Sequence, residues 1–168
     1  SVVLPLTEGR NELWMAVSES FGGWGFMARN GDAEWSDGRL RQSWKLEHRL
    51  RLPESIVYDA DRDRLYVSNF FNEGKEFISI VSTDGSILEK ECIAGLRQPT
   101  GLALHDDVLY IVDRAGVHAH DAESGEELYV ARKAGVMFLN DICVAEDGVG
   151  YVSDSRASRI YRLRDGAM

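Results

Sequence analysis

Three polar residues, Glu54, Thr100 and Asn140, each stand directly before an apolar segment that reads as a β-strand. Hard divalent cations such as Ca²⁺ bind carboxylate, amide and water oxygens. Glu54 offers a charged oxygen and Asn140 a neutral one, so the two would be metal ligands if the fold brings them together. A Glu or Asn at such a position can also cap a turn or face solvent, and spacing alone does not decide between these roles.

The segments that must position these residues form a repeat. In each copy a polar step leads into an apolar strand, a tight polar turn follows, and a second strand reads Tyr, aliphatic, small or aliphatic, then Asn or Asp. The copies run over 53–69, 99–113 and 139–154. Self-similarity at about 40 to 45 residues is typical of β-propeller blades, in which each unit is one four-stranded sheet. We therefore predict an all-β fold that is a partial β-propeller.

Period-2 alternation and turn residues predict the strands of each copy, and no helix is expected. The expected strands are 55–58, 64–69, 77–81 and 87–92 in the first copy, 101–104, 108–113, 117–120 and 127–131 in the second, and 142–144, 149–153 and 159–163 in the third. In a propeller the first strand of each blade lines the central channel, so the residue before it projects into the channel mouth. This places Glu54, Thr100 and Asn140 at one mouth.

The repeat accounts for about two and a half blades, whereas a closed propeller has at least four. The third copy stops near the turn that should lead into its last strand, which would leave unpaired strand edges. We therefore expect the sequence to be a fragment of a longer chain. The alternative, in which several short chains form one ring, is disfavoured by a break within a hairpin.

The N-terminal segment 1–36 does not belong to the repeat. A strand at 13–17 followed by GGWGFMAR at 22–29 resembles the last β-hairpin of the jelly-roll β-sandwich modules attached to bacterial secreted enzymes. Such modules often bind carbohydrate, although Trp24 in this hairpin is more readily a core residue than a sugar platform. Residues 37–43 have the composition of a linker.

The segment 44–50 reads as an outer strand that would close the last blade of the ring. We therefore expect the propeller domain to span 44–168, after the N-terminal remnant at 1–36 and the linker at 37–43.

Composition excludes some partners and leaves the compartment open. The formal net charge is −9 and the isoelectric point is near 4.9, which argues against nucleic-acid binding. No apolar run approaches the roughly 18 residues of a membrane span, and the N-terminus lacks the pattern of a signal peptide. The jelly-roll likeness slightly favours a periplasmic or secreted location. Cys92 and Cys143 have no metal-ligand spacing and read as packing residues.

Two further sets of polar residues recur or alternate. Asn69, Asp113 and Asp154 each end the second strand of a copy, which favours a structural role in which the side chain accepts backbone N–H bonds in the following turn. The alternative is that they orient the residues of the mouth, a role that Thr100 and Asp141 could share.

His118 and His120 alternate on one face of a predicted strand, a spacing that could chelate a metal ion. With no third ligand nearby in the sequence, we interpret them as surface residues or as residues between blades.

Longer runs resemble a known family. The runs PES at 53–55 and YVSN at 66–69, and above all FLND at 138–141, YVSDS at 151–155 and RIYRL at 159–163, are similar to the gluconolactonase, regucalcin (senescence marker protein) and luciferin-regenerating-enzyme family. The resemblance implies a six-bladed β-propeller whose mouth holds one divalent metal ion, Ca²⁺ or Zn²⁺. It also implies an enzyme that hydrolyses small-molecule lactones or related esters.

The resemblance covers roughly 44–168 and assigns roles to single residues. In that family a Glu before the first inner strand binds the metal, the next blade supplies no ligand, and an Asn of the following blade contacts substrate or metal-bound water. Glu54, Thr100 and Asn140 follow this order, which implies that Glu54 and Asn140 are metal ligands and that Asn140 takes part in catalysis. Phe138 stands where several lactonases carry an Arg that reaches the substrate, so a sugar-lactone substrate is not implied.

Two functions remain open. The first is a metal-dependent hydrolase whose remaining Asn and Asp ligands, including the general base, come from blades beyond Met168, so that this fragment alone is inactive. The second is a non-catalytic propeller, similar to NHL-type repeats, that binds a protein or glycan partner. The two differ in whether Glu54 and Asn140 converge with the further ligands.

Overall fold

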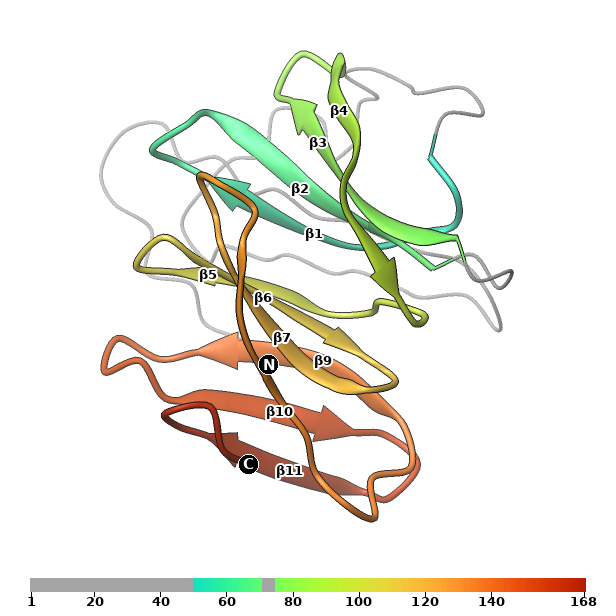
Figure 1. Cartoon of the computed structure of the whole chain (residues 1–168), viewed down its shortest axis with the longest axis vertical. Coiled ribbons are helices and arrows are strands. Elements are labelled where there is room, and N and C mark those ends of the chain that lie inside the picture. The colour runs from blue at the N-terminus through green and yellow to red at the C-terminus, as the bar shows by residue number, and fades with distance from the viewer. Residues whose placement is uncertain (1–49, 71–74) are drawn as a thin grey trace, which may run out of the picture.

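The structure is a computed structural model that describes residues 50–70 and 75–168. Within these ranges the chain is all-β, with eleven strands and no helix (Figure 1). The strands form three antiparallel sheets, with the strand orders β1-β2-β3-β4, β5-β6-β7-β8 and β9-β10-β11. The hairpin and linker expected within 1–43, and the closing strand expected at 44–50 apart from its last residue, lie outside the described residues.

Each copy of the sequence repeat forms one sheet. The first contains β1 (Pro53–Asp59), β2 (Arg64–Asn69), β3 (Glu76–Ser82) and β4 (Ile87–Leu96); the second contains β5 (Leu102–His105), β6 (Val108–Asp113), β7 (Gly116–Asp121) and β8 (Glu127–Ala131); the third contains β9 (Leu139–Val144), β10 (Gly150–Asp154) and β11 (Arg159–Leu163). The predicted bounds of β2, β6, β8 and β11 are confirmed, and the other strands differ by a few residues at their ends.

Tight polar turns make each sheet a meander of consecutive strands. The turn between β5 and β6 consists of Asp106 and Asp107, whose φ angles are 46° and 60°. Two positive φ values are typical of the type I′ turn, which matches the twist of the strands it joins. Asp tolerates this conformation because its short side chain can form local hydrogen bonds.

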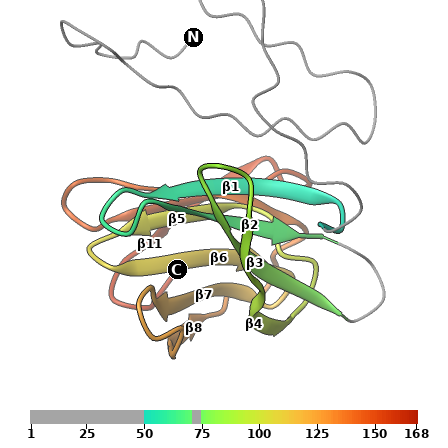
Figure 2. The same ribbon diagram turned by 90° about the horizontal axis from the view of Figure 1, so that it is seen from above.

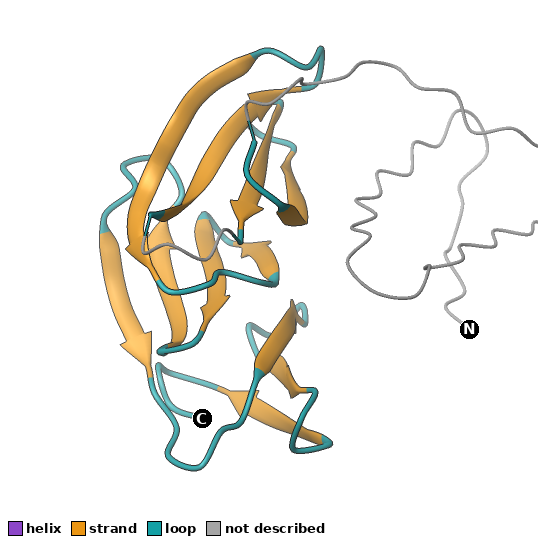
Figure 3. Ribbon diagram, turned by 90° about the vertical axis from the view of Figure 1, so that its right-hand side faces the viewer, coloured by secondary structure: helices purple, strands orange, loops and turns teal. Residues whose placement is uncertain are grey.

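The core lies between the sheets, which pack in chain order. Alternate side chains of β6 point to opposite faces of its sheet, so Leu109 and Ile111 pack in the cluster with the first sheet, whereas Val112 packs with the third. Leu109, Ile111 and Val112 are all fully buried. The middle sheet therefore has two apolar faces, and each face is covered by a neighbouring sheet (Figure 3).

The first strands of the three sheets lie side by side. The backbone N–H of Leu102 in β5 donates to Oγ of Ser55 in β1 over 3.2 Å, and the N–H of Gly101 donates to the carbonyl oxygen of Asn140 in β9 over 2.9 Å. Figure 2 shows β1 and β5 at one side of the molecule, with β4 and β8 at the opposite side. The residues that precede or begin β1, β5 and β9 are thereby gathered at one edge.

Within the part of the chain that the structure describes, there is no helix with the length and apolar character needed to cross a bilayer.

Candidate functional site

Acidic and amide side chains at the ends of β2, β6 and β10 hold the loops that enter the site. Asp154 accepts hydrogen bonds from the backbone N–H groups of Met137 and Phe138, over 2.8 and 2.9 Å, and of Ala157 over 3.1 Å. Because Met137 and Phe138 directly precede β9, Asp154 positions the start of that strand. These bonds lower the pKa of Asp154 even though burial raises it.

The other two copies use the same device. Asp113 accepts from the N–H of Arg97, in the loop before β5, over 2.9 Å, and from the N–H of Gly116 in the following turn over 3.1 Å. Asn69 accepts from the N–H of Arg51, before β1, over 2.8 Å. Asp113 and Asp154 thus accept backbone N–H bonds from the turn that follows their strand, as expected, whereas the bond to Asn69 comes from the segment before β1. Among the described residues, no hydrogen bond joins any of them to the side chain of Glu54 or Asn140.

Thr100 is also a structural residue. It is buried, and its hydroxyl lies 3.4 Å from the carbonyl oxygens of both Val112 and Leu139. The hydroxyl therefore ties the start of β5 to β6 and to β9.

Glu54 and Asn140 both lie in irregular parts of their strands. The pairing of β1 with β2 shifts between Pro53 and Ile56, and the pairing of β9 with β10 shifts between the partners of Val152 and Asp154. Such bulges redirect side chains and are frequent beside active sites.

Serines of the second strands satisfy the backbone at these bulges. The N–H of Ser55 donates to Oγ of Ser68 over 2.9 Å, and the N–H of Asp141 donates to Oγ of Ser153 over 3.1 Å. Ser68 and Ser153 occupy the same position of the repeat, directly before Asn69 and Asp154. Each therefore stabilises the backbone of the residue that follows Glu54 or Asn140, respectively.

Glu54 and Asp141 form the electrostatic centre of this edge. Burial, and then the negative charge of Asp141, raise the pKa of Glu54 to about 7. Asp141 belongs to the third sheet and Glu54 to the first, and β5 lies between their strands. Glycine at position 101 lets Asp141 lie against the start of β5, because a Cβ there would lie 2.5 Å from Oδ1 and 2.6 Å from Cα of Asp141.

Asn140 is half-buried, and its backbone carbonyl oxygen accepts a hydrogen bond from the N–H of Gly101. Within the described ranges its side-chain amide has no hydrogen-bond partner. The charge of Asp141 therefore acts on Glu54, whereas no hydrogen bond joins Glu54 to the Asn140 side chain within the described ranges.

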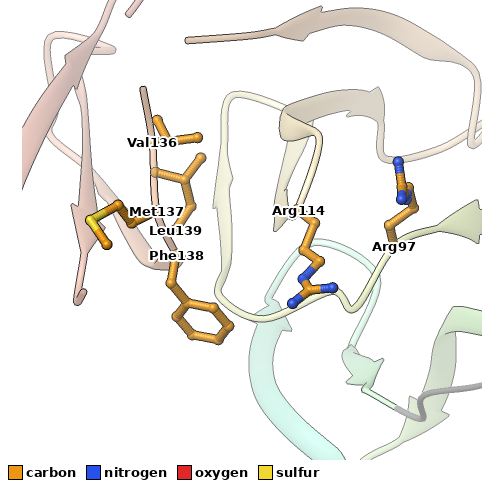
Figure 4. A pocket seen from close by; sticks show the side chains of 6 residues that line it. All are labelled: Arg97, Arg114, Val136, Met137, Phe138 and Leu139. Carbon is orange, nitrogen blue, oxygen red and sulfur yellow. The ribbon is translucent and has the colours of Figure 1, made fainter. Parts of the chain in front are cut away.

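A pocket of about 250 Å³ opens at the same edge (Figure 4). Its lining comes from the loops around β5 and β6 and from the start of β9: Arg97, Arg114, Val136, Met137, Phe138 and Leu139. Arg97 and Arg114 project from one side, opposite the 136–139 segment. Among the described residues, neither guanidinium takes part in an ion pair. The Arg156 guanidinium lies over the Phe138 ring, 5.2 Å from its centroid.

A second cluster of ligand-type side chains lies away from the first strands. His118 and His120 of β7 and Glu127 of β8 each offer one ligand atom, and these atoms lie within 4.8 Å of one another. The two histidines were interpreted as surface residues or as residues between blades, with no third ligand nearby. The surface alternative is wrong because both are buried, and Glu127, which lies opposite His120 in the β7–β8 ladder, is a third ligand-type side chain. The sequence could have indicated Glu127 as the third residue, because strands 117–120 and 127–131 were predicted and their pairing as a hairpin brings Glu127 close to the histidines.

The two cysteines differ. Cys92 packs against the first core cluster, and burial raises the pKa of its thiol to about 12. Cys143 is exposed, contrary to the expectation of a packing residue, because it alternates with the buried Ile142 on β9.

No protein-family model matches this chain, and no curated protein matches it.

Proposed function

We propose that the three sheets are consecutive blades of a six-bladed β-propeller similar to the gluconolactonase, regucalcin and luciferin-regenerating-enzyme family. Three observations support this arrangement: the chain-order packing of the sheets, the burial of the middle sheet on both faces, and the hydrogen bonds that join β1, β5 and β9. In this arrangement those three strands line the channel, and Glu54, Asn140 and Asp141 lie at its mouth. A six-bladed ring would contain blades besides these three.

The proposed activity of the complete propeller is metal-dependent hydrolysis of a lactone or related ester. The observation that carries this proposal is the effect of Asp141 on Glu54. Glu54 is half-buried, and burial together with the negative charge of Asp141 raises its pKa to about 7. Two neighbouring carboxylates disfavour each other's ionisation, but the ionised form of both becomes favourable when a cation lies between them. The donor set of carboxylate and amide oxygens fits a hard divalent cation such as Ca²⁺.

In this proposal Glu54 and Asn140 hold the metal ion, and Asp141 adds negative charge beside it. A bound divalent ion polarises an ester carbonyl and lowers the pKa of a water molecule. The Asn140 amide, which has no other partner among the described residues, orients the substrate. The general base would be a carboxylate from a blade other than the three described here.

The pocket indicates the substrate class. The Phe138 ring offers an apolar surface, and the guanidinium groups of Arg97 and Arg114 offer hydrogen-bond donors and positive charge on the facing wall. This combination suits a small ring compound with one apolar face and an anionic or hydroxyl-bearing edge.

One observation favours the alternative of a non-catalytic propeller. Arg97 and Arg114 are exposed, so they would equally suit an acidic group on a protein or glycan partner. The two functions differ in their need for a metal ion at Glu54.

The test is calcium titration calorimetry on the complete protein, with lactone hydrolysis measured on the same samples. Glu54→Gln keeps the size of the side chain and removes its charge, and Glu89→Gln, at an exposed position of β4, is the matched control. We expect Glu54→Gln to abolish stoichiometric calcium binding and to lower kcat/KM by at least about 100-fold. Calcium binding and hydrolysis that persist in a folded Glu54→Gln variant would overturn the proposal, and a folded wild type indifferent to metal would leave the binding propeller.

A further inference from the structure

We propose that His118, His120 and Glu127 form a zinc site on the β7–β8 hairpin. This site is separate from the mouth residues, and the inference does not depend on the proposed hydrolase function.

The hairpin places the three side chains on one face. His118 and His120 lie two residues apart on β7, so their side chains point the same way, while Ala119 between them points to the other face. The two rings are stacked, with centroids 6.3 Å apart and an interplanar angle of 21°. His120 pairs with Glu127 in the ladder, at a point where the register shifts, so the carboxylate reaches both rings.

The Nδ1 atom of His118 faces the carboxylate of Glu127. Its Nε2 lies 3.1 Å from Oδ2 of Asp113, and its Nδ1 lies 2.9 Å from Oε2 of Glu127. The Nε2 atom is buried beside this carboxylate but is not aligned for a hydrogen bond with it. When Nε2 carries the ring proton, Nδ1 has a lone pair available for a metal ion. A carboxylate behind a histidine is the arrangement that orients many zinc-binding imidazoles.

The contacts of His120 leave its Nε2 available for a metal ion. Its Nδ1 lies 3.0 Å from the carbonyl oxygen of Gly125, and a carbonyl only accepts, so Nδ1 carries the proton. The remaining nitrogen, Nε2, is buried and has no hydrogen-bond partner among the described residues, and it lies 3.9 Å from Oε2 of Glu127. His120 is only 6% exposed, so a lone pair with no partner here is unfavourable unless an ion occupies the space.

The chemistry of this donor set selects zinc. Two imidazole nitrogens and one carboxylate oxygen form a known three-ligand zinc set that leaves a fourth position for water. Zinc–ligand bonds of about 2.0–2.1 Å in a tetrahedron place the ligand atoms roughly 3.3 Å apart. The distances from Oε2 of Glu127 to Nδ1 of His118 and to Nε2 of His120, 2.9 and 3.9 Å, lie on either side of that value. Calcium is disfavoured because it prefers oxygen ligands.

The surrounding charge also favours a cation. With neutral imidazoles, Asp113 and Glu127 leave two negative charges around the cluster. A bound cation would offset these charges. It would also supply a partner for Nε2 of His120, which is buried and has no hydrogen-bond partner among the described residues. The half-exposed side chain of Glu127 gives the ion a route from solvent.

The test is zinc binding by the 168-residue chain, measured in competition with a chromophoric chelator. Glu127→Gln removes the carboxylate ligand at a partly exposed position, and His105→Ala, in the β5–β6 hairpin, is the control for histidine content. We expect wild type, His105→Ala and Glu54→Gln to bind one zinc ion at this site, and Glu127→Gln to bind it at least about tenfold more weakly. Equal zinc affinity in wild type and a folded Glu127→Gln variant would overturn the inference.

A second measurement requires no variant. Nitrogen-15 spectra of the histidine rings should show that added zinc shifts Nδ1 of His118 and Nε2 of His120. If neither resonance changes at zinc concentrations that saturate the chelator assay, the site does not exist.

Discussion

Nε2 of His118 lies 3.1 Å from Oδ2 of Asp113, the residue that ends β6 and fixes the loop leading into β5. One carboxylate therefore serves both regions that carry chemistry in this chain. Asp113 lies beside the His118 imidazole of the His118–His120–Glu127 cluster. It also accepts a hydrogen bond from the backbone N–H of Arg97, a residue that lines the pocket. Burial raises the pKa of Asp113, but its bonds to His118 and to backbone N–H groups lower it by more.

Asp113→Ala should destabilise the fold strongly. Asp113 is 1% exposed and accepts from the N–H groups of Arg97, Ala115 and Gly116. Leaving these donors unsatisfied costs about 2–4 kcal/mol in the free energy of unfolding. Urea denaturation followed by circular dichroism measures the loss. Glu123→Ala, an exposed residue of a turn, should stay within about 0.5 kcal/mol of wild type. Equal midpoints for Asp113→Ala and Glu123→Ala would show that Asp113 does not hold the loops.

Gly101→Ala should disrupt the contact between the second and third sheets. The new Cβ would meet Oδ1 and Cα of Asp141 and the backbone nitrogen of Ile142, at 2.5, 2.6 and 2.9 Å. Because two of these atoms belong to the backbone, β9 must move, at a cost of about 1–3 kcal/mol.

Gly95→Ala is the matched control, because its Cβ would meet nothing within 4 Å and only its φ of 80° opposes the change. That conformation costs about 1 kcal/mol. Thermal unfolding should therefore rank Gly101→Ala below Gly95→Ala. The reverse order would mean that Asp141 is not held against β5.

Tyr66→Phe should weaken the contact between the first and second sheets. The buried Tyr66 hydroxyl donates to the carbonyl oxygen of Ala122, in the turn between β7 and β8, over 2.6 Å, and Arg64 reaches the same oxygen over 2.7 Å. Loss of the hydroxyl costs about 1–2 kcal/mol. Tyr58→Phe, whose hydroxyl donates to Asp63 at an exposed site, should cost less than about 0.5 kcal/mol. Chemical denaturation of the two variants side by side tests the difference.

Glu54 should make the metal-free protein less stable as pH rises. Its pKa is about 7 in the folded chain against an ordinary 4.5, so the folded state binds more protons than the unfolded state between these values. The stability that Glu54 contributes is complete below pH 4.5 and is lost as pH rises through about 7. Glu54→Gln lacks this loss, so its melting temperature relative to wild type should increase over that interval in the presence of a chelator.

Other groups also titrate in this range, and only the difference between wild type and Glu54→Gln isolates Glu54. A difference that is flat from pH 4.5 to 8 would show that burial and Asp141 do not perturb this carboxyl. Added calcium should remove the difference at pH 8 if the mouth binds the ion, because it stabilises the ionised side chain.

The sequence by itself determined the strands and their order within each sheet. Period-2 alternation and polar turns are local signals, and they placed β2, β6, β8 and β11 at their observed bounds. The recurrence of Asn69, Asp113 and Asp154 also identified residues that accept backbone hydrogen bonds, because each acts within its own repeat.

Only the tertiary structure decided which residues from different strands meet. Asp141 perturbs Glu54 because β1, β5 and β9 pack side by side and Gly101 lets β9 come close. Glu127 joins His118 and His120 because a register shift in the β7–β8 ladder sets its position. The pocket likewise combines loops of two sheets. Spacing along a chain carries no information about register shifts or about the approach of one sheet to another, since these depend on side-chain packing between segments far apart in the sequence.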